Sequence, residues 1–184
     1  MTDLHTLERV TIGLSSFRKS SDRNSSRALY VKNCEELKEL RMGRYSFSDY
    51  SVIEIENVDK LEVLKIGELN EESHNFYYAS LELKNLPSLK SLLLGRMSFY
   101  SSTLFAVENL PELTSIQLGY SALSFEPNGA SNALVMRNLP KLTSLTTTMP
   151  GSISFRFARH MTLYDMPSLT TVSLYSPFWD RKSV

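Results

Sequence analysis

The chain has 184 residues, of which 42% are hydrophobic, and its 20 basic residues balance 20 acidic ones. This balance gives no electrostatic reason to expect nucleic acid as a partner, and no apolar run is long enough to predict insertion into a membrane. The single cysteine, Cys34, excludes an internal disulfide framework. The N-terminus lacks the basic and apolar regions of a signal peptide, which slightly favours a cytoplasmic location and leaves the compartment open.

One motif recurs along the whole chain: a leucine, two variable residues and then an alternating apolar pair, usually followed by glycine. Its clearest copy is LKNLPSLKSLLLG at 83–95, which recurs as VENLPELTSIQLG at 107–119. A repeat with a fixed period indicates stacked structural units. The leading leucines stand 24 to 30 residues apart and predict about seven coils, starting near Leu7, Leu37, Leu61, Leu89, Leu113, Leu142 and Leu169.

Each coil also carries a second apolar pair, which is followed by asparagine and often by Leu-Pro. Leu81, Leu83 and Asn85 form the clearest copy. Both pairs alternate with period 2, which is the period of a β-strand. The segments between them are rich in serine, asparagine, glycine and tyrosine and show no helical periodicity. The sequence therefore predicts two short strands per coil, stacked into two facing parallel sheets with little helix.

This repeat resembles the leucine-rich-repeat family over nearly the whole chain. It is most similar to the variants with a second strand per coil, of the protist and bacterial-surface types. The resemblance implies a mainly β, right-handed solenoid that forms a single domain over residues 1–184. It also implies that outward residues of the first strands form a binding face: Arg41, Lys65, Leu93, Gln117, Thr146 and Ser173. Alternatively, serine and threonine are there as soluble strand residues.

Stacked coils turn recurring residues into columns. The glycine after the first strand is expected to allow a tight turn. Phenylalanines follow it and are expected to point inward and stack: Phe17, Phe47, Phe76, Phe99, Phe125, Phe155 and Phe178. Asparagines are expected to form a buried ladder of amides: Asn33, Asn57, Asn85, Asn109 and Asn138, with Asp165 in the last full coil. Residues of alternating charge precede them and predict ion pairs between coils: Lys32, Glu56, Lys84, Glu108 and Arg137.

The segment between glycine and the second strand varies most in length. Insertions in solenoids gather on one edge, and that edge often binds a partner. Four tyrosines fall there and suit a recognition surface: Tyr50, Tyr77, Tyr78 and Tyr100. Tolerated loop variation is an equally good interpretation of this edge.

The sequence shows no chemistry that predicts an enzyme, a cofactor or a metal site. The histidines fall in different coils at unmatched positions: His5, His74 and His160. Cys34 occupies an apolar slot that leucine fills elsewhere, so it is expected to be a buried thiol. Our main hypothesis is a module that binds a protein ligand. The alternatives are a structural protein that self-associates end to end and a regulatory piece of a larger protein, with carbohydrate binding at the tyrosine edge a weaker option.

Overall fold

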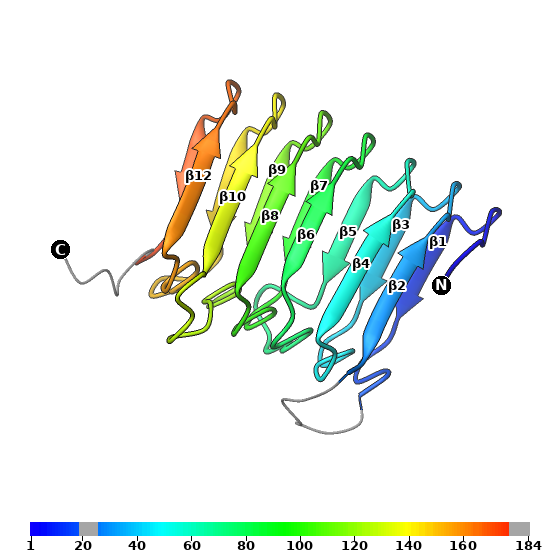
Figure 1. The fold of residues 1–184 in the computed structure, drawn as a ribbon, viewed down its shortest axis with the longest axis horizontal. Coiled ribbons are helices and arrows are strands. Elements are labelled where there is room, and N and C mark those ends of the chain that lie inside the picture. The colour runs from blue at the N-terminus through cyan, green and yellow to red at the C-terminus, as the bar shows by residue number, and fades with distance from the viewer. Residues whose placement is uncertain (19–25, 177–184) are drawn as a thin grey trace.

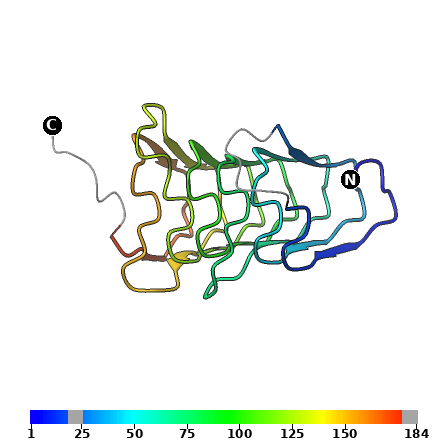
Figure 2. The same ribbon diagram turned by 90° about the horizontal axis from the view of Figure 1, so that it is seen from below.

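The computed structural model describes residues 1–18 and 26–176, which form a β-solenoid of about six turns. Thirteen strands and no helix lie in these residues. The odd-numbered strands form one seven-stranded parallel sheet: β1 (Arg9–Ile12), β3 (Glu39–Met42), β5 (Val63–Ile66), β7 (Ser91–Leu94), β9 (Ser115–Leu118), β11 (Ser144–Thr147) and β13 (Thr171–Ser173). Figure 1 shows the turns following one another along the molecule, and Figure 2 shows the two faces as opposite layers.

The second face differs from the single sheet that the sequence predicts. It consists of a two-stranded sheet, β2 (Ala28–Lys32) and β4 (Val52–Glu56), and a separate four-stranded sheet. The four-stranded sheet contains β6 (Leu81–Lys84), β8 (Leu104–Glu108), β10 (Ala133–Arg137) and β12 (His160–Tyr164). β4 and β6 are not paired, so the ladder on this face is interrupted at that point in the described chain.

The core is built from columns of apolar side chains between the two faces. Leading leucines from Leu37 to Leu142 are fully buried, whereas Leu7 and Leu169, in the first and last turns, are only partly so. Strand residues alternate between the core and the outer surface as period 2 requires. Each fully buried side chain of this size contributes about 1.5–3 kcal/mol relative to exposure to water.

The glycine column allows close approach between neighbouring turns. Gly119 has no positive φ, but a Cβ placed on it would lie 2.3 Å from the backbone nitrogen of Arg96 in the preceding turn. Gly43 meets the backbone of Gly13 in the same way, at 2.8 Å. Glycine is therefore required at these two positions because two backbones touch, whereas Gly67, with a φ of 79°, adopts the left-handed conformation that the expected tight turn needs.

The predicted phenylalanine stack is continuous from Phe17 to Phe99, and farther along the chain Phe125 and Phe155 meet with tilted rings, 6.2 Å between centroids. The ring centroids of Phe47 and Phe76 are 5.4 Å apart, and those of Phe76 and Phe99 are 5.5 Å apart. Phe17 stacks on Phe47 but is 62% exposed, because no earlier ring covers it. The six described phenylalanines of this column have φ between 48° and 72°. This left-handed conformation costs a bulky residue about 1–2 kcal/mol, which burial of the ring offsets. Phe178 lies outside the described residues.

The asparagine ladder exists, but the expectation that it is buried is wrong. Asn57 Nδ2 donates to Asn33 Oδ1 at 2.9 Å, and Asn138 Nδ2 donates to Asn109 Oδ1 at 2.8 Å, yet these side chains are exposed or half-buried. All members of the column have φ between 53° and 58°. Asparagine tolerates this left-handed conformation better than most residues, and that requirement explains the column. Among the described residues, no amide hydrogen bond joins Asn57 to Asn85.

The column of alternating charge forms ion pairs within each of the two sheets. Lys32 Nζ lies 3.0 Å from Glu56, and Glu108 binds both Lys84, at 3.1 Å, and Arg137. Burial raises the pKa of Glu108, but the hydrogen bonds from Lys84 and Arg137 outweigh it and hold the pKa below its usual value. The pairing predicted between Glu56 and Lys84 is absent, because these residues flank the interruption.

Substitution of Phe76 by alanine should lower the free energy of unfolding by about 3–5 kcal/mol, because it leaves a cavity in the middle of the ring stack. Phe17→Ala is the matched control in the same column, where the exposed ring predicts a change of about 0.5 kcal/mol or less. Chemical denaturation of both variants measures the difference. Equal losses would show that the stack does not stabilise the interior.

Substitution of Glu108 by glutamine should lower the free energy of unfolding by about 1–3 kcal/mol at neutral pH, because the carboxylate is buried between two cations. A pKa lowered by folding stabilises the protein above the ordinary glutamate pKa, and this contribution is lost as the pH falls through the lower pKa of the folded state. Denaturation curves of the two proteins should therefore converge in acid. The exposed Glu56→Gln should show a smaller change, and a constant difference at all pH values would contradict the assignment.

Candidate functional site

The six residues expected on a binding face lie in one row across the seven-stranded sheet. Strand pairing places them side by side in chain order: Arg41, Lys65, Leu93, Gln117, Thr146 and Ser173. The side chains point outward and are half-buried or exposed. The structure thus confirms that these residues share a face, and their role in binding stays a prediction.

A second outward row runs beside the first and changes character along the chain. It begins with Arg9, Glu39 and Val63 and continues with small hydroxyl side chains: Ser91, Ser115, Ser144 and Thr171. The sheet is therefore charged toward its N-terminal end and neutral toward its C-terminal end. A partner that covers this face meets different chemistry at each turn.

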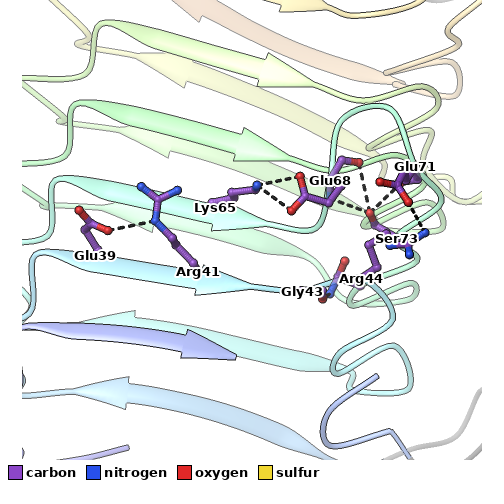
Figure 3. A network of polar contacts seen from close by, with 9 residues as sticks. Glu39, Arg41, Gly43, Arg44, Lys65, Glu68, Glu71 and Ser73 are labelled. Carbon is purple, nitrogen blue, oxygen red and sulfur yellow. Dashed lines mark hydrogen bonds and ion pairs between the residues drawn. The ribbon is translucent and has the colours of Figure 1, made fainter. Parts of the chain in front are cut away.

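Ion pairs fix the charged end of the row. Arg41 Nε donates to Glu39 Oε2 at 3.0 Å, and Arg9 Nε lies 3.3 Å from the same oxygen. The hydrogen bond from Arg41 holds the pKa of Glu39 below its usual value, although burial opposes it. Lys65 Nζ contacts Glu68 at 2.7 Å, at the corner where the strand ends (Figure 3). These contacts restrict the conformations of the Arg41 and Lys65 side chains in the free protein.

The corner next to Lys65 is held by a serine that contacts three backbone groups. Ser73 Oγ accepts a hydrogen bond from the Glu68 N–H at 2.8 Å and donates to the carbonyls of Glu68 and Glu71 (Figure 3). Arg44 pairs with the Glu71 carboxylate at 2.6 Å. The loop that borders the row is therefore fixed at several points.

The structure brings three of the four candidate tyrosines together at the loop edge. Tyr77 stacks on Tyr100, with ring centroids 5.2 Å apart, and meets the edge of Tyr78 at 4.7 Å. Tyr50 is separate in role: its ring packs edge-on against Phe47 at 4.9 Å and belongs with the core. Tyr77, Tyr78 and Tyr100 thus form a cluster at this edge, and a role for them in recognition stays a prediction.

Two further aromatic residues join this edge and were missed by sequence reasoning. Tyr45 stacks on His74 at 5.6 Å, and His74 stacks on Tyr77 at 5.7 Å. Both residues stand two positions before a column phenylalanine, so an alignment of the coils on that column brings them together. Arg18 covers the outer face of Tyr45, 5.6 Å from the ring centroid.

A hollow of about 250 Å³ opens beside these rings. It is lined by Arg18, Tyr45, Ser48, Asp49, His74, Tyr77 and Tyr78. These rings stack on one another, so much of each aromatic face is already covered. A sugar that binds by stacking on a free aromatic face therefore has little surface to contact here. Stacking between turns accounts for the aromatic run, which favours the structural interpretation of this edge over a carbohydrate site.

The histidine, cysteine and acidic residues of the described chain do not gather into a metal-binding cluster. No group of three or more histidine, cysteine or acidic residues could hold a metal ion in this part of the chain. Cys34 is fully buried, as predicted, and its sulfur lies 3.4 Å from the carbonyl of Lys32. Within the same residues, no helix is long and apolar enough to cross a membrane.

The recurring leucines, phenylalanines and asparagines are thus explained by contacts between turns. Neighbouring turns differ in the outward row of the seven-stranded sheet and in the loop edge. No family model, curated protein or solved structure matches this chain.

Proposed function

We propose that the protein is a non-enzymatic protein-recognition module, built as a right-handed leucine-rich-repeat solenoid of about seven coils. The observation that supports this most strongly is the continuous register that aligns the row from Arg41 to Ser173 on one sheet. A row of this kind offers one side chain per turn at a fixed spacing of about 4.8 Å. Changes at single positions then alter specificity without disturbing the core.

The chemistry of the row favours a partner whose surface combines charged, apolar and polar groups. Arg41 and Lys65 are each matched by a carboxylate of this chain, so their charges add more to orientation than to raw affinity. Leu93 is the apolar residue of the row and is flanked by Lys65 and Gln117. A buried apolar anchor surrounded by polar contacts is the usual arrangement at the centre of a protein interface.

Reversal of the chemistry at the middle of the row tests this proposal. The variant combines Leu93→Glu with Gln117→Lys, two neighbours on β7 and β9. The matched control combines Val135→Glu with Thr162→Lys, two outward neighbours on the opposite face. Proteins captured from a lysate by the unchanged chain should bind the row variant at least about tenfold more weakly, because a central interface residue contributes more than 1 kcal/mol. They should bind the control unchanged.

Two outcomes contradict the proposal. The first is equal loss of binding in the row variant and the control, which would place the site elsewhere. The second is the absence of any saturable macromolecular partner for the unchanged protein. Circular dichroism of both variants verifies that the solenoid is intact before binding is measured.

End-to-end self-association is a second candidate function, favoured by apolar side chains exposed toward both ends of the described solenoid. Leu14 and Phe17 are 61% and 62% exposed near one end, and Leu163 and Val172 are 48% and 57% exposed near the other. Uncapped solenoid ends can stack on another copy. Light scattering across a wide range of concentration should show growth in mass, and a strictly monomeric protein at high concentration would rule this candidate out.

A further inference from the structure

The interruption between β4 and β6 separates two strands that should be neighbours. At the corresponding positions elsewhere, the asparagine N–H bonds the next turn: Asn33 donates to the Glu56 carbonyl at 3.1 Å, and Asn85 donates to the Glu108 carbonyl at 3.4 Å. The equivalent bond from Asn57 to the Lys84 carbonyl is absent in the described chain, together with the amide and ion-pair contacts of that step. We call this interruption the seam.

A shorter corner precedes the seam in the third turn. Five positions separate Phe76 from Leu81, whereas six separate Phe47 from Ile53 and Phe99 from Phe105. The hydroxyl of Ser80 replaces the missing backbone acceptor toward the next turn, because its Oγ accepts a hydrogen bond from the Leu104 N–H at 3.1 Å. This contact adds to the strand pairing of β6 with β8, and no equivalent contact toward β4 is present among the described residues.

The seam leaves two strand edges with unpaired backbone groups facing each other. In parallel strands, alternate residues direct both N–H and C=O to the same side. The Glu56 carbonyl faces β2, so Ile53 and Ile55 direct their backbone groups toward the seam. Asn85 faces β8, so Glu82 and Lys84 direct theirs toward the seam from the other side.

Between these edges lies a groove of about 710 Å³. One side is the whole of β4 with its flanks, from Ser51 to Asn57, and the other includes Ser80, Glu82, Lys84 and Asn85. Ile53 and Ile55 remain 7% exposed, whereas Leu81 and Leu83 on the far side are fully buried. The groove is as long as β4, which has five residues.

We propose that the seam binds an extended segment of a partner protein, which adds a strand between β4 and β6. Backbone hydrogen bonds supply the recognition, as in other cases where a peptide extends an exposed sheet edge. Alternate side chains of the peptide then face the apolar column of Ile53 and Ile55, and the others face outward. This site lies on the face opposite the candidate row and does not depend on the function proposed for that row.

The charges at the rim define the outward side chains of the peptide. Three carboxylates line the groove, those of Glu54, Glu56 and Glu82, and the one cation in its lining, Lys84, pairs with Glu82 at 3.0 Å. Lys32 pairs with Glu54 and Glu56 from the far side of β4. The excess of acidic groups selects a segment that alternates apolar and basic residues.

Binding also requires the seam to widen. Some Cα atoms of β4 and β6 lie within 8 Å of each other, whereas a strand placed between two others needs about 9.6 Å. Contacts that persist on both sides of the seam limit the movement: the Tyr77 N–H bonds the Ser48 carbonyl at 3.3 Å, and the Lys90 N–H bonds the Glu62 carbonyl at 2.9 Å. The two sheets can therefore part between these points without the solenoid coming apart.

The first test uses a synthetic ten-residue peptide of alternating valine and lysine, with both termini capped and a fluorescent label. The purified protein should bind it saturably, and a peptide N-methylated at alternate residues should bind at least about tenfold more weakly, since it keeps the charge but lacks the strand donors. A valine–glutamate peptide should also bind weakly. If the N-methylated peptide binds equally well, charge attraction alone explains the binding and the proposal is overturned. The absence of saturable binding would also overturn it.

The second test changes the strand edge itself. Glu82→Pro removes an N–H that faces the seam and has no strand partner, so the fold should tolerate it. Glu82→Gln is the matched control, which removes the same charge and keeps the N–H. The proline variant should bind the valine–lysine peptide several-fold more weakly than the glutamine variant, and equal affinity would contradict strand addition. The other possible occupant of the seam is a second copy of the chain, and sedimentation without peptide tests for it. A dimer in which the amide protons of Ile53 and Ile55 are protected from exchange would assign the seam to that second copy.

Discussion

Parallel stacking of each turn on the one before it is the constraint on which this structure depends. A spacing of about 4.8 Å leaves each recurring position in contact with its own copies, so a residue type that suits one turn suits the whole column. Leucines pack on leucines, phenylalanine rings lie face to face, and amides bond to amides. At Gly119 the neighbouring backbones approach so closely that a Cβ has no room.

The corners of the solenoid carry a conformational cost that the columns offset. Phenylalanine and asparagine both adopt φ near +55° at most of their recurring positions, and only asparagine tolerates this readily. The phenylalanines are retained there because the turn directs the ring into the core, where its burial and stacking outweigh the cost. Phenylalanine and asparagine thus occupy the same left-handed conformation at opposite corners of the coil. The phenylalanine side chain points into the core, and the asparagine side chain lies outside it.

Departures from the repeat carry the functional proposals. The outward row of the seven-stranded sheet varies from turn to turn while its backbone register continues without a break. On the other face, the corner before Leu81 is one residue shorter than its neighbours, and β4 and β6 do not pair there. Where the repeat is regular, neighbouring turns satisfy one another's hydrogen bonds and cover one another's side chains. Where the repeat is irregular, backbone groups and side chains stay accessible to a partner.

The sequence by itself determined the parallel two-faced coil, the inward phenylalanine stack, the burial of Cys34 and the shared face of the row from Arg41 to Ser173. Period-2 alternation and spacing are local properties, and stacking turns them directly into neighbours. Only the tertiary structure decided that the asparagines lie outside, because their side follows from a left-handed φ that period 2 ignores. It also decided that Tyr45 and His74 join Tyr77, and that the second face is divided. Whether two strands pair depends on the backbone paths of the corners that precede both of them. The sequence of a single turn therefore does not contain that information.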